Sequence, residues 1–499
     1  MKSMKQWLCL LLAALMISTA LVACANDPAE QETPDDTSST PTGDTEQGGE
    51  DDPDEVDLLL QLPSYNFGGE EFVILCRTDK EYEIDSPSGQ TGDTVNDAIF
   101  ARNARIEELY QVDLVSAPVN GTWDEQSMFT GALKTAVTSG SEDYDLVAGY
   151  LAYISKLAME DCFYNLHAVN TLNLENEWWS ESFTENLTLF DCLFFADGDI
   201  SLTMWESLYA MYFNKQLAED RGIDNLYELV ADGEWTMEYL YEMTEELYED
   251  NGNDKVDKED TFGLIVNCHS LRAMVTTCGI PLTARNDEGT YDIVFFDDFT
   301  IDLFDELYSY VHENDSVYMM VLQDDSDYTD ILRMFTNNQA LFITGTLDQS
   351  AVLRNMDTAF GIVPFPKYDD AQETYLSHSY DGHSIFSIPA SLADPSMSGA
   401  IMDALGAESR QSVVPQYYEV VLKGRTTRDE ESREMLDIIR ENLYFDFGFV
   451  YSNSLDFLYS KFGDLIENSS KSFASSIASV STKYETLLGE IIEKYESVS

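Results

Sequence analysis

The chain has 499 residues, with 93 Asp and Glu against 27 Lys and Arg, which gives a formal net charge of −66. This charge excludes a nucleic-acid-binding protein, because phosphate binding needs clustered Lys and Arg, and it argues against docking on anionic lipid surfaces. Aromatic residues make up 12% of the chain, so a sizeable core can form.

The N-terminus has the features of an export signal. Lys2 and Lys5 precede an apolar run from Trp7 to Ala23, which is short for a membrane span and typical of a signal peptide. The run ends in Leu21-Val-Ala-Cys24, which resembles the bacterial lipobox. We therefore expect residues 1–23 to be a signal peptide and Cys24 to carry a lipid such as palmitate. This lipid would anchor the chain to the extracellular face of the cell membrane. An ordinary signal peptide with a chance cysteine, or an uncleaved anchor, is the alternative.

Residues 24–63 are predicted to be the lipidated cysteine and a disordered acidic tether. The stretch from Ala25 to Pro63 holds thirteen acidic residues and no Lys or Arg, and Pro, Thr, Ser and Gly fill most of the rest. High like charge with low hydrophobicity keeps such a segment extended. The remaining chain, from about residue 64, is long enough for two lobes.

Short apolar strands alternate with amphipathic helices in the body, which favours an α/β fold. Strands are predicted at 71–76, 112–116 and 144–148, with intervening helices, the first of them capped by Asp93. Short links between them favour a parallel arrangement. Further strands are predicted at 339–344, 360–364 and 384–388, helices at 226–230 and 235–247, and a last amphipathic helix whose apolar stripe faces the core.

The cysteines do not form a disulfide framework. Cys9 lies in the signal peptide and Cys24 is the lipid site, which leaves an odd number in apolar contexts. Buried free thiols are therefore expected, although one bridge between Cys268 and Cys278 stays open.

Seven segments, taken in order, resemble the extracellular solute-binding proteins of ABC sugar importers, the Gram-positive lipoprotein type related to maltose-binding protein. They are Gly92-Asp-Thr-Val-Asn-Asp-Ala98, Asp143-Tyr-Asp-Leu-Val147, Tyr212-Phe-Asn-Lys215, Asp232-Gly-Glu-Trp-Thr236, Asn338-Gln-Ala-Leu-Phe342, Phe360-Gly-Ile-Val-Pro-Phe-Pro-Lys-Tyr368 and Ser432-Arg-Glu-Met-Leu436.

This resemblance implies a periplasmic-binding-protein-like fold of type II, with two α/β lobes and a ligand cleft between them. Lobe 1 would hold residues 64–205 and about 373–415, and lobe 2 would hold 206–370 and about 416–499. The chain would cross between the lobes near Trp205 to Tyr209, near 368–376 and near 415. It also implies a monomer that captures a sugar and delivers it to the membrane subunits of an ABC permease.

Sugars are held by aromatic stacking and by hydrogen bonds from carboxylates, amides and arginine, so aromatic–polar pairs just after strands are the candidate ligand residues. Trp205 and Glu206 stand at the expected first crossing and are predicted to give a stacking floor and a hydroxyl acceptor. The segment after the lobe-2 strand is Thr346-Leu-Asp348, without the aromatic residues of the maltose binder, which puts maltodextrin in doubt as the ligand. The full candidate set is Arg77, Tyr150, Trp205, Glu206, Thr346, Tyr380 and Asp381.

One acidic segment fits the spacing of an EF-hand calcium loop. Calcium needs six to eight oxygen ligands on a tightly turned loop. Position 6 is Asp254 instead of Gly, and position 12 is Asp instead of Glu, so an acidic helix connector is the alternative interpretation. A calcium ion there would be structural, and no cofactor is otherwise required. The predicted ligands are Glu249, Asn251, Asn253, Lys255 through its carbonyl, Asp257 and Asp260.

The sequence carries no catalytic motif that would identify an enzyme, because GxSxG, HExxH, the P-loop and GxGxxG after a strand are all absent. With 93 acidic residues in the chain, a pair of carboxylates neither indicates nor excludes a glycosidase site. The prediction is therefore a non-enzymatic binding protein. A surface glycan-binding or glycan-cleaving lipoprotein is the alternative, and an adhesin without a transported ligand is a third reading.

Overall fold

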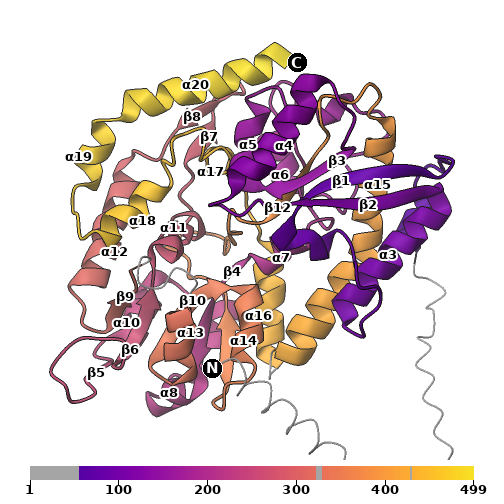
Figure 1. The fold of residues 1–499 in the computed structure, drawn as a ribbon. Coiled ribbons are helices and arrows are strands. Elements are labelled where there is room, and N and C mark those ends of the chain that lie inside the picture. The colour runs from indigo at the N-terminus through magenta and orange to yellow at the C-terminus, as the bar shows by residue number, and fades with distance from the viewer. Residues whose placement is uncertain (1–55, 322–328, 427–429, 499) are drawn as a thin grey trace, which may run out of the picture. The chain divides into compact units, whose positions relative to one another are not determined.

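The computed structural model describes residues 56–321, 329–426 and 430–498. Residues Asp57–Ser499 cluster as one compact unit. The predicted signal peptide, the lipid site at Cys24 and nearly all of the tether lie outside the described residues, so those interpretations stay predictions. The predicted lobe boundaries also stay predictions, although the strands do group into two main sheets (Figure 1).

The first sheet has the strand order β12-β3-β1-β2. Strand β1 (Glu70–Arg77) runs parallel to β2 (Val112–Val119) and to β3 (Leu146–Tyr150), which confirms the predicted parallel arrangement, whereas β12 (Ser384–Ser387) is antiparallel to β3. Helices α3 (Thr94–Tyr110) and α4 (Gln126–Ser139) pack on β2, and α5 (Leu151–Ala158) packs on β3.

Strand β1 is buried on both faces, as expected for the centre of a parallel sheet. Successive side chains of a strand point to opposite faces. Leu75 accordingly belongs to the larger hydrophobic cluster, while Ile74 and Cys76 belong to the smaller one. The predicted cap of α3 is also present, because the Asp93 carboxylate accepts hydrogen bonds from two backbone N–H groups, both at 3.1 Å.

The second sheet has the order β11-β4-β10-β6-β5, with β9 paired to β6. Strand β4 is antiparallel to both of its neighbours, β10 and β11, and β10 is parallel to β6. The bounds are β4 (Tyr209–Asn214), β5 (Tyr248–Glu249), β6 (Thr261–Val266), β9 (Val317–Met319), β10 (Ala340–Thr346) and β11 (Phe360–Val363). A separate hairpin joins β7 (Thr283–Arg285) to β8 (Tyr291–Ile293).

The remaining elements are helical. The helices that precede β4, or that follow β12 up to residue 426, are α2 (Leu58–Gln61), η1 (Thr78–Glu83), η2 (Leu166–Ala168), α6 (Glu181–Leu187), α7 (Leu202–Glu206), α15 (Ser396–Glu408), η4 (Ser409–Val413) and η5 (Gln416–Thr426). Those that follow β4 are α8 (Lys215–Asp220), α9 (Leu226–Ala231), α10 (Met237–Thr244), α11 (Cys268–Thr277), α12 (Asp298–His312), α13 (Thr329–Thr336), η3 (Leu347–Gln349) and α14 (Ser350–Leu353). The last are α16 (Glu430–Glu441), α17 (Phe447–Val450), α18 (Ser460–Glu467), α19 (Phe473–Ala478) and α20 (Ser481–Val498).

Two further expectations about packing are confirmed. All five cysteines among the described residues are free and buried, so Cys268 and Cys278 form no bridge. The apolar stripe of α20 packs into the larger core cluster through Tyr484, Leu488, Ile491 and Tyr495.

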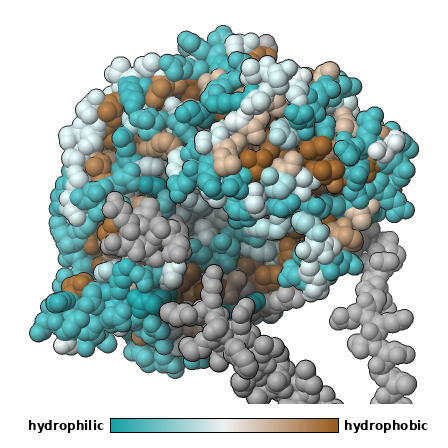
Figure 2. Space-filling model, in the orientation of Figure 1, coloured by the Kyte–Doolittle hydropathy of each residue, from teal (hydrophilic) through white to brown (hydrophobic). Residues whose placement is uncertain are grey.

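The surface is mainly hydrophilic. Figure 2 shows hydrophilic residues over most of one face, in line with the net charge of −66. Within the part of the chain that the structure describes, no helix combines the length and apolarity needed to cross a bilayer.

Candidate functional site

A cavity of about 550 Å³ opens where the carboxyl ends of β1 and β3 approach the end of β10. Ligands of open α/β sheets bind beyond the carboxyl ends of strands. We call it the cleft cavity. Four of the seven predicted ligand residues line it, namely Arg77, Tyr150, Thr346 and Tyr380. The other lining residues are Asp79, Lys80, Thr122, Trp123, Ser207, Tyr209, His269, Leu332, Asp348, Gln349, Val352 and Gly382.

Arg77, the last residue of β1, is a buried anchor of this cavity. Its Nη1 donates to the carbonyl of Gly382 at 2.7 Å, and its Nη2 lies 3.0 Å from Asp79 Oδ2. The guanidinium also lies over the ring of Tyr150, 4.9 Å from its centre. Arg77 therefore joins the end of β1 to the segment that precedes β12 and supports the Tyr150 ring from behind.

Tyr150 and Tyr380 form a pair of neutral phenols. Their hydroxyl oxygens are 3.1 Å apart, and the Tyr150 hydroxyl donates weakly to Asp381 Oδ1 at 3.5 Å. Burial, with a further contribution from Asp381, raises the pKa of Tyr380 to about 12 and the pKa of Tyr150 well above its usual value of 10. Asp381 thus does not line the cavity but lies behind it, where it orients the two phenol groups.

The segment before β12 is held by a buried histidine. The Nδ1 of His383 donates to the carbonyl of Tyr380 at 2.7 Å, and its Nε2 lies 2.8 Å from Asp197 Oδ2. Burial lowers the pKa of His383, but the Asp197 carboxylate outweighs it and raises the pKa above its usual value. A Cβ on Gly382 would come within 2.5 Å of the Tyr380 ring, so only glycine lets that ring fold back into the cavity.

Trp123 is the most exposed aromatic residue on the cavity wall. It follows β2, is 41% exposed, and its ring lies 6.0 Å from that of Tyr150 and 5.6 Å from that of Phe457, measured between centres. Sequence reasoning missed it, together with Tyr209, His269 and Asp348. The available signal was an indole directly after the predicted strand, in Asn120-Gly-Thr-Trp123.

The polar groups of the cavity are largely neutral or already bonded. Burial, followed by the nearby Arg272, lowers the pKa of His269 to about 3, so this imidazole is uncharged at neutral pH. Thr346 Oγ1 donates to Asp348 Oδ1 at 2.6 Å. The cavity therefore presents aromatic faces with hydrogen-bonding groups between them.

The structure does not bring Trp205 or Glu206 into the cleft cavity. Trp205 is 8% exposed and lines a different cavity, where its ring lies under the guanidinium of Arg440 at 4.9 Å. Glu206 lines a third, largely apolar cavity of about 310 Å³, where it accepts a hydrogen bond from the hydroxyl of Tyr82 and lies 4.0 Å from Lys80 Nζ. Burial, reinforced by Asp348 and Glu83, raises the pKa of Glu206 to about 7.

The acidic loop between β5 and β6 has the turn that calcium loops use, but its carboxylates bond to the loop itself. Asp254, at the glycine position, adopts a left-handed conformation with φ of 57°. The two carboxylate oxygens of Asp260 accept from the N–H groups of Asn251 and Asp257, at 2.9 and 3.0 Å. Among the described residues, no group of three or more His, Cys, Asp or Glu side chains is arranged to hold a metal ion. Calcium binding stays a prediction.

No family model matches the chain, and no curated protein matches it in sequence. Solved structures do share its fold. An ABC substrate-binding protein from Listeria monocytogenes, in complex with cycloalternan, aligns with a TM-score of 0.52 at 11% identity over 86% of this chain and 98% of its own. The galacto-N-biose/lacto-N-biose I-binding protein of the ABC transporter from Bifidobacterium longum, in complex with lacto-N-biose, gives 0.52 at 10% identity over 86% and 98%.

A third similar structure, UgpB from Mycobacterium tuberculosis in complex with glycerophosphocholine, gives a TM-score of 0.54 at 12% identity over 85% of this chain and 99% of its own. The predicted α/β fold of the periplasmic-binding-protein type is therefore confirmed. At these identities the likeness defines the fold and leaves the ligand to be argued from the site.

Proposed function

We propose that this protein is the substrate-binding component of an ABC importer and that it takes a sugar or oligosaccharide into the cleft cavity. The support is the position of the cavity at the strand ends, its four aromatic residues, and the fold it shares with the sugar binders named above. A volume of about 550 Å³ lies within the usual range of about 300–1,000 Å³ for small-molecule sites.

The observation that carries the proposal is the aromatic wall formed by Trp123, Tyr150 and Tyr380. An exposed indole at the mouth offers a flat apolar face to the C–H face of a sugar ring, and two neutral phenols offer hydroxyl groups to its rim. Arg77 is already bonded to Asp79 and Gly382, so the wall is in place before a ligand arrives. Preorganisation of this kind lowers the entropic cost of binding.

The charge balance of the cavity favours an uncharged ligand. Arg77 and Lys80 are matched by Asp79 and Asp348, and the imidazole of His269 is neutral. A phosphodiester such as the ligand of UgpB would need an unmatched cationic group, whereas a neutral sugar needs only donors and acceptors.

In this proposal the protein works outside the cell, anchored by lipid on Cys24, as a monomer without catalytic activity. The ligand binds the aromatic wall first, and closure of the second sheet brings Thr346 and Asp348 onto its other side. The closed form then delivers the sugar to the membrane subunits of the permease. The acidic tether supplies reach between the lipid anchor and the permease.

The test is a thermal-shift screen of the soluble chain from residue 57 onward with neutral mono- and oligosaccharides, uronic acids and glycerophosphocholine. A ligand that binds only the native state raises Tm by mass action. We expect a neutral sugar to give the largest rise. A rise with glycerophosphocholine alone would overturn the sugar assignment, and hydrolysis of an oligosaccharide during incubation would favour the glycan-cleaving alternative.

Matched variants locate the site. Trp123→Ala removes the stacking face, and we expect it to weaken sugar binding about tenfold with little change in Tm, because the indole is 41% exposed. Phe100→Ala removes a similarly exposed ring, 39% exposed on α3 and outside the cavity, and should leave affinity unchanged. Equal affinities in both variants would place the ligand elsewhere.

We also propose that the loop from Glu249 to Asp260 binds calcium as a structural ion. The left-handed Asp254 supports this, because the sixth position of such loops requires that conformation. Calcium should raise Tm in the intact protein and not in Asp257→Ala, while magnesium at the same concentration serves as the control. An unchanged Tm in the intact protein would contradict the proposal.

A further inference from the structure

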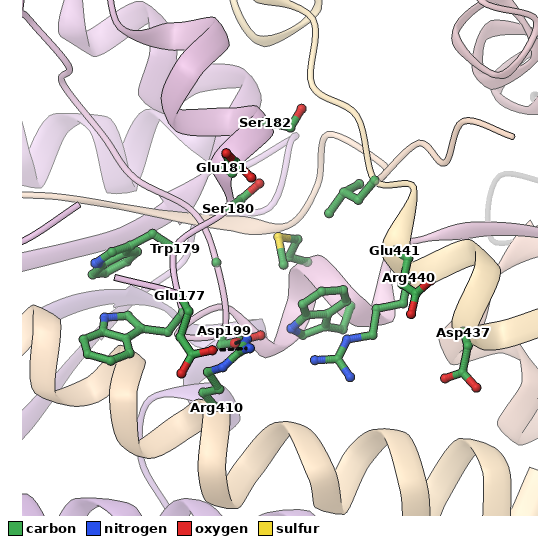
Figure 3. Close-up of a pocket in the computed structure, with 15 residues that line it drawn as sticks. Glu177, Trp179, Ser180, Glu181, Ser182, Asp199, Arg410, Asp437, Arg440 and Glu441 are labelled. Carbon is green, nitrogen blue, oxygen red and sulfur yellow. Dashed lines mark hydrogen bonds and ion pairs between the residues drawn. The ribbon is translucent and has the colours of Figure 1, made fainter. Parts of the chain in front are cut away.

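A second cavity of about 460 Å³ lies beside the crossing helix α7 and shares no lining residue with the cleft cavity. Figure 3 shows its side chains. Its wall combines three tryptophans with two arginines and several carboxylates. The tryptophans are Trp178, Trp179 and Trp205, and the arginines are Arg410 and Arg440.

Elements of both sheets build this cavity. The segment that ends in Gly198 is tied to the first sheet, because Ala196 pairs with Phe386 of β12. Helix α16, which supplies Asp437 and Arg440, packs on β11 of the second sheet. Figure 3 shows Arg410 and Arg440 entering the cavity from two different helical segments.

The two arginines differ in how they are bonded. Arg410 lies 2.9 Å from the carboxylate of Asp199 and 2.9 Å from that of Glu177. Arg440 contacts only aromatic rings among the described residues, with its guanidinium 4.9 Å from the centre of Trp205 and 5.1 Å from that of Tyr418. Its N–H groups make no hydrogen bond or ion pair with any described residue, so they are available to a ligand.

Asp199 also lies beside the indole of Trp205. The indole Nε1 of Trp205 is buried and lies near Asp199 without completing a hydrogen bond of ordinary geometry. Asp199 is 3% exposed and is the one buried carboxylate that faces the guanidinium groups of both Arg410 and Arg440. Arg410 is already matched by Asp199 and Glu177, so the guanidinium donors of Arg440 are the ones left for a ligand, and a carboxylate would satisfy them.

The rim of the cavity carries exposed carboxylates. Glu181 and Glu441 are exposed there and pair with no cation among the described residues, and Met204 and Leu443 add apolar surface to the lining. A ligand with several negative charges would be repelled at this rim. A molecule with one carboxylate, an apolar body and an ammonium group matches both the Arg440 guanidinium and the carboxylates of the rim.

We propose that this second cavity binds a small zwitterion, a free α-amino acid with an aliphatic side chain. The carboxylate takes the N–H groups of Arg440, the ammonium group faces Glu181 and Glu441, and the side chain lies against Met204 and Leu443. This site is independent of the sugar proposal, because no residue is shared between the two cavities.

Calorimetry with three matched compounds tests the charge assignment: L-leucine, L-leucinamide, which lacks the carboxylate, and 4-methylpentanoate, which lacks the ammonium group. We expect L-leucine to bind and each analogue to lose about tenfold or more, because each forfeits a charge-assisted hydrogen bond. Absence of binding by L-leucine, or an equal affinity for L-leucinamide, would overturn the proposal.

A matched pair of variants on α16 tests the location. Arg440→Gln should weaken L-leucine binding about tenfold or more, whereas Arg433→Gln, two helical turns earlier and bonded to Glu430 at 2.9 Å, should leave it unchanged. Both variants should keep the sugar affinity of the parent protein. Unchanged L-leucine binding in Arg440→Gln, or competition between L-leucine and the sugar, would overturn the assignment.

Discussion

The cleft-cavity wall from the first sheet is built of aromatic rings that contact one another, whereas the wall from the second sheet combines Tyr209 and His269 with short polar and aliphatic side chains. On the first side, Arg77 supports Tyr150, which in turn contacts Tyr380 and Trp123. On the second side, Tyr209 and His269 accompany Leu332, Thr346, Asp348, Gln349 and Val352. The difference teaches that sugar affinity should depend mainly on the first wall, while the second wall adds hydrogen-bonding groups on the other side of the ligand and touches the first wall through the contacts of Tyr209 and His269 with Tyr380.

The largest effect is expected at Trp205, which is buried, in contrast to the exposed Trp123 of the cleft cavity. Trp205→Ala should lower the free energy of unfolding by about 3–4 kcal/mol, because Trp205 is 8% exposed and packs under Arg440. Sugar affinity in the folded fraction should stay close to normal. Urea unfolding with sugar calorimetry on the same variant measures both. A tenfold loss of sugar affinity at unchanged stability would instead support the sequence-based prediction that Trp205 is the stacking floor.

The next largest effect, counting stability and sugar affinity together, is expected from replacing Arg77, which supports the aromatic wall. Arg77→Met removes the hydrogen bond to Gly382 and the partner of Asp79, and should cost about 2–3 kcal/mol of stability. Sugar affinity should fall as well, because the Tyr150 ring loses its support. Denaturant titration reports the first effect and calorimetry the second. Arg433→Met, at an arginine whose side chain is 39% exposed, should change neither.

Glu206 lies outside the cleft cavity but near a charged residue of each wall, Lys80 and Asp348. Its pKa is raised from 4.5 to about 7, so the folded protein binds a proton that the unfolded chain releases, and stability falls as pH rises through that window. Glu206→Gln should be more stable than the parent by about 3 kcal/mol above pH 7, and the difference should shrink toward pH 4.5. Unfolding at both ends of this range is the measurement, with exposed Glu434→Gln as control. A constant difference across pH would contradict the burial argument.

The smallest effect concerns the phenol pair. Tyr380→Phe removes the hydroxyl that lies 3.1 Å from that of Tyr150 and should cost about 1 kcal/mol of stability. Tyr150→Phe should cost a similar amount. Because the two hydroxyls share one bond, the double variant should cost less than the sum, and a double-mutant cycle measures this coupling. Strict additivity would show that the pair does not interact in solution.

The sequence predicted the first sheet well because its signals are local. Short apolar runs marked β1, β2 and β3, and Asp93 marked the start of α3 by a capping bond that depends only on neighbouring residues. The ligand candidates that the structure brings together lie at strand ends, or directly before β12. Their approach follows from parallel pairing, which places such ends at one edge of the sheet.

The rest of the site depends on tertiary arrangement. Trp205 and Glu206 are neighbours on the short helix α7, and adjacent residues of a helix point about 100° apart, so they face two different cavities. Their direction depends on the rotation of that one turn, which no local pattern defines. His269 and Asp348 reach the cleft cavity only because the second sheet approaches the first, and sequence spacing carries no record of that approach.

The exposure of Trp123 also gives the protein an optical reporter. Among the described residues, the other tryptophans, Trp178, Trp179, Trp205 and Trp235, are between 0 and 8% exposed. A water-soluble quencher such as acrylamide should therefore reach mainly one indole, the one at the mouth of the cleft cavity. Quenching of Trp123 fluorescence should therefore report whether a ligand occupies the mouth of the cavity. Stopped-flow fluorescence of the unlabelled protein can then measure the rate of ligand binding.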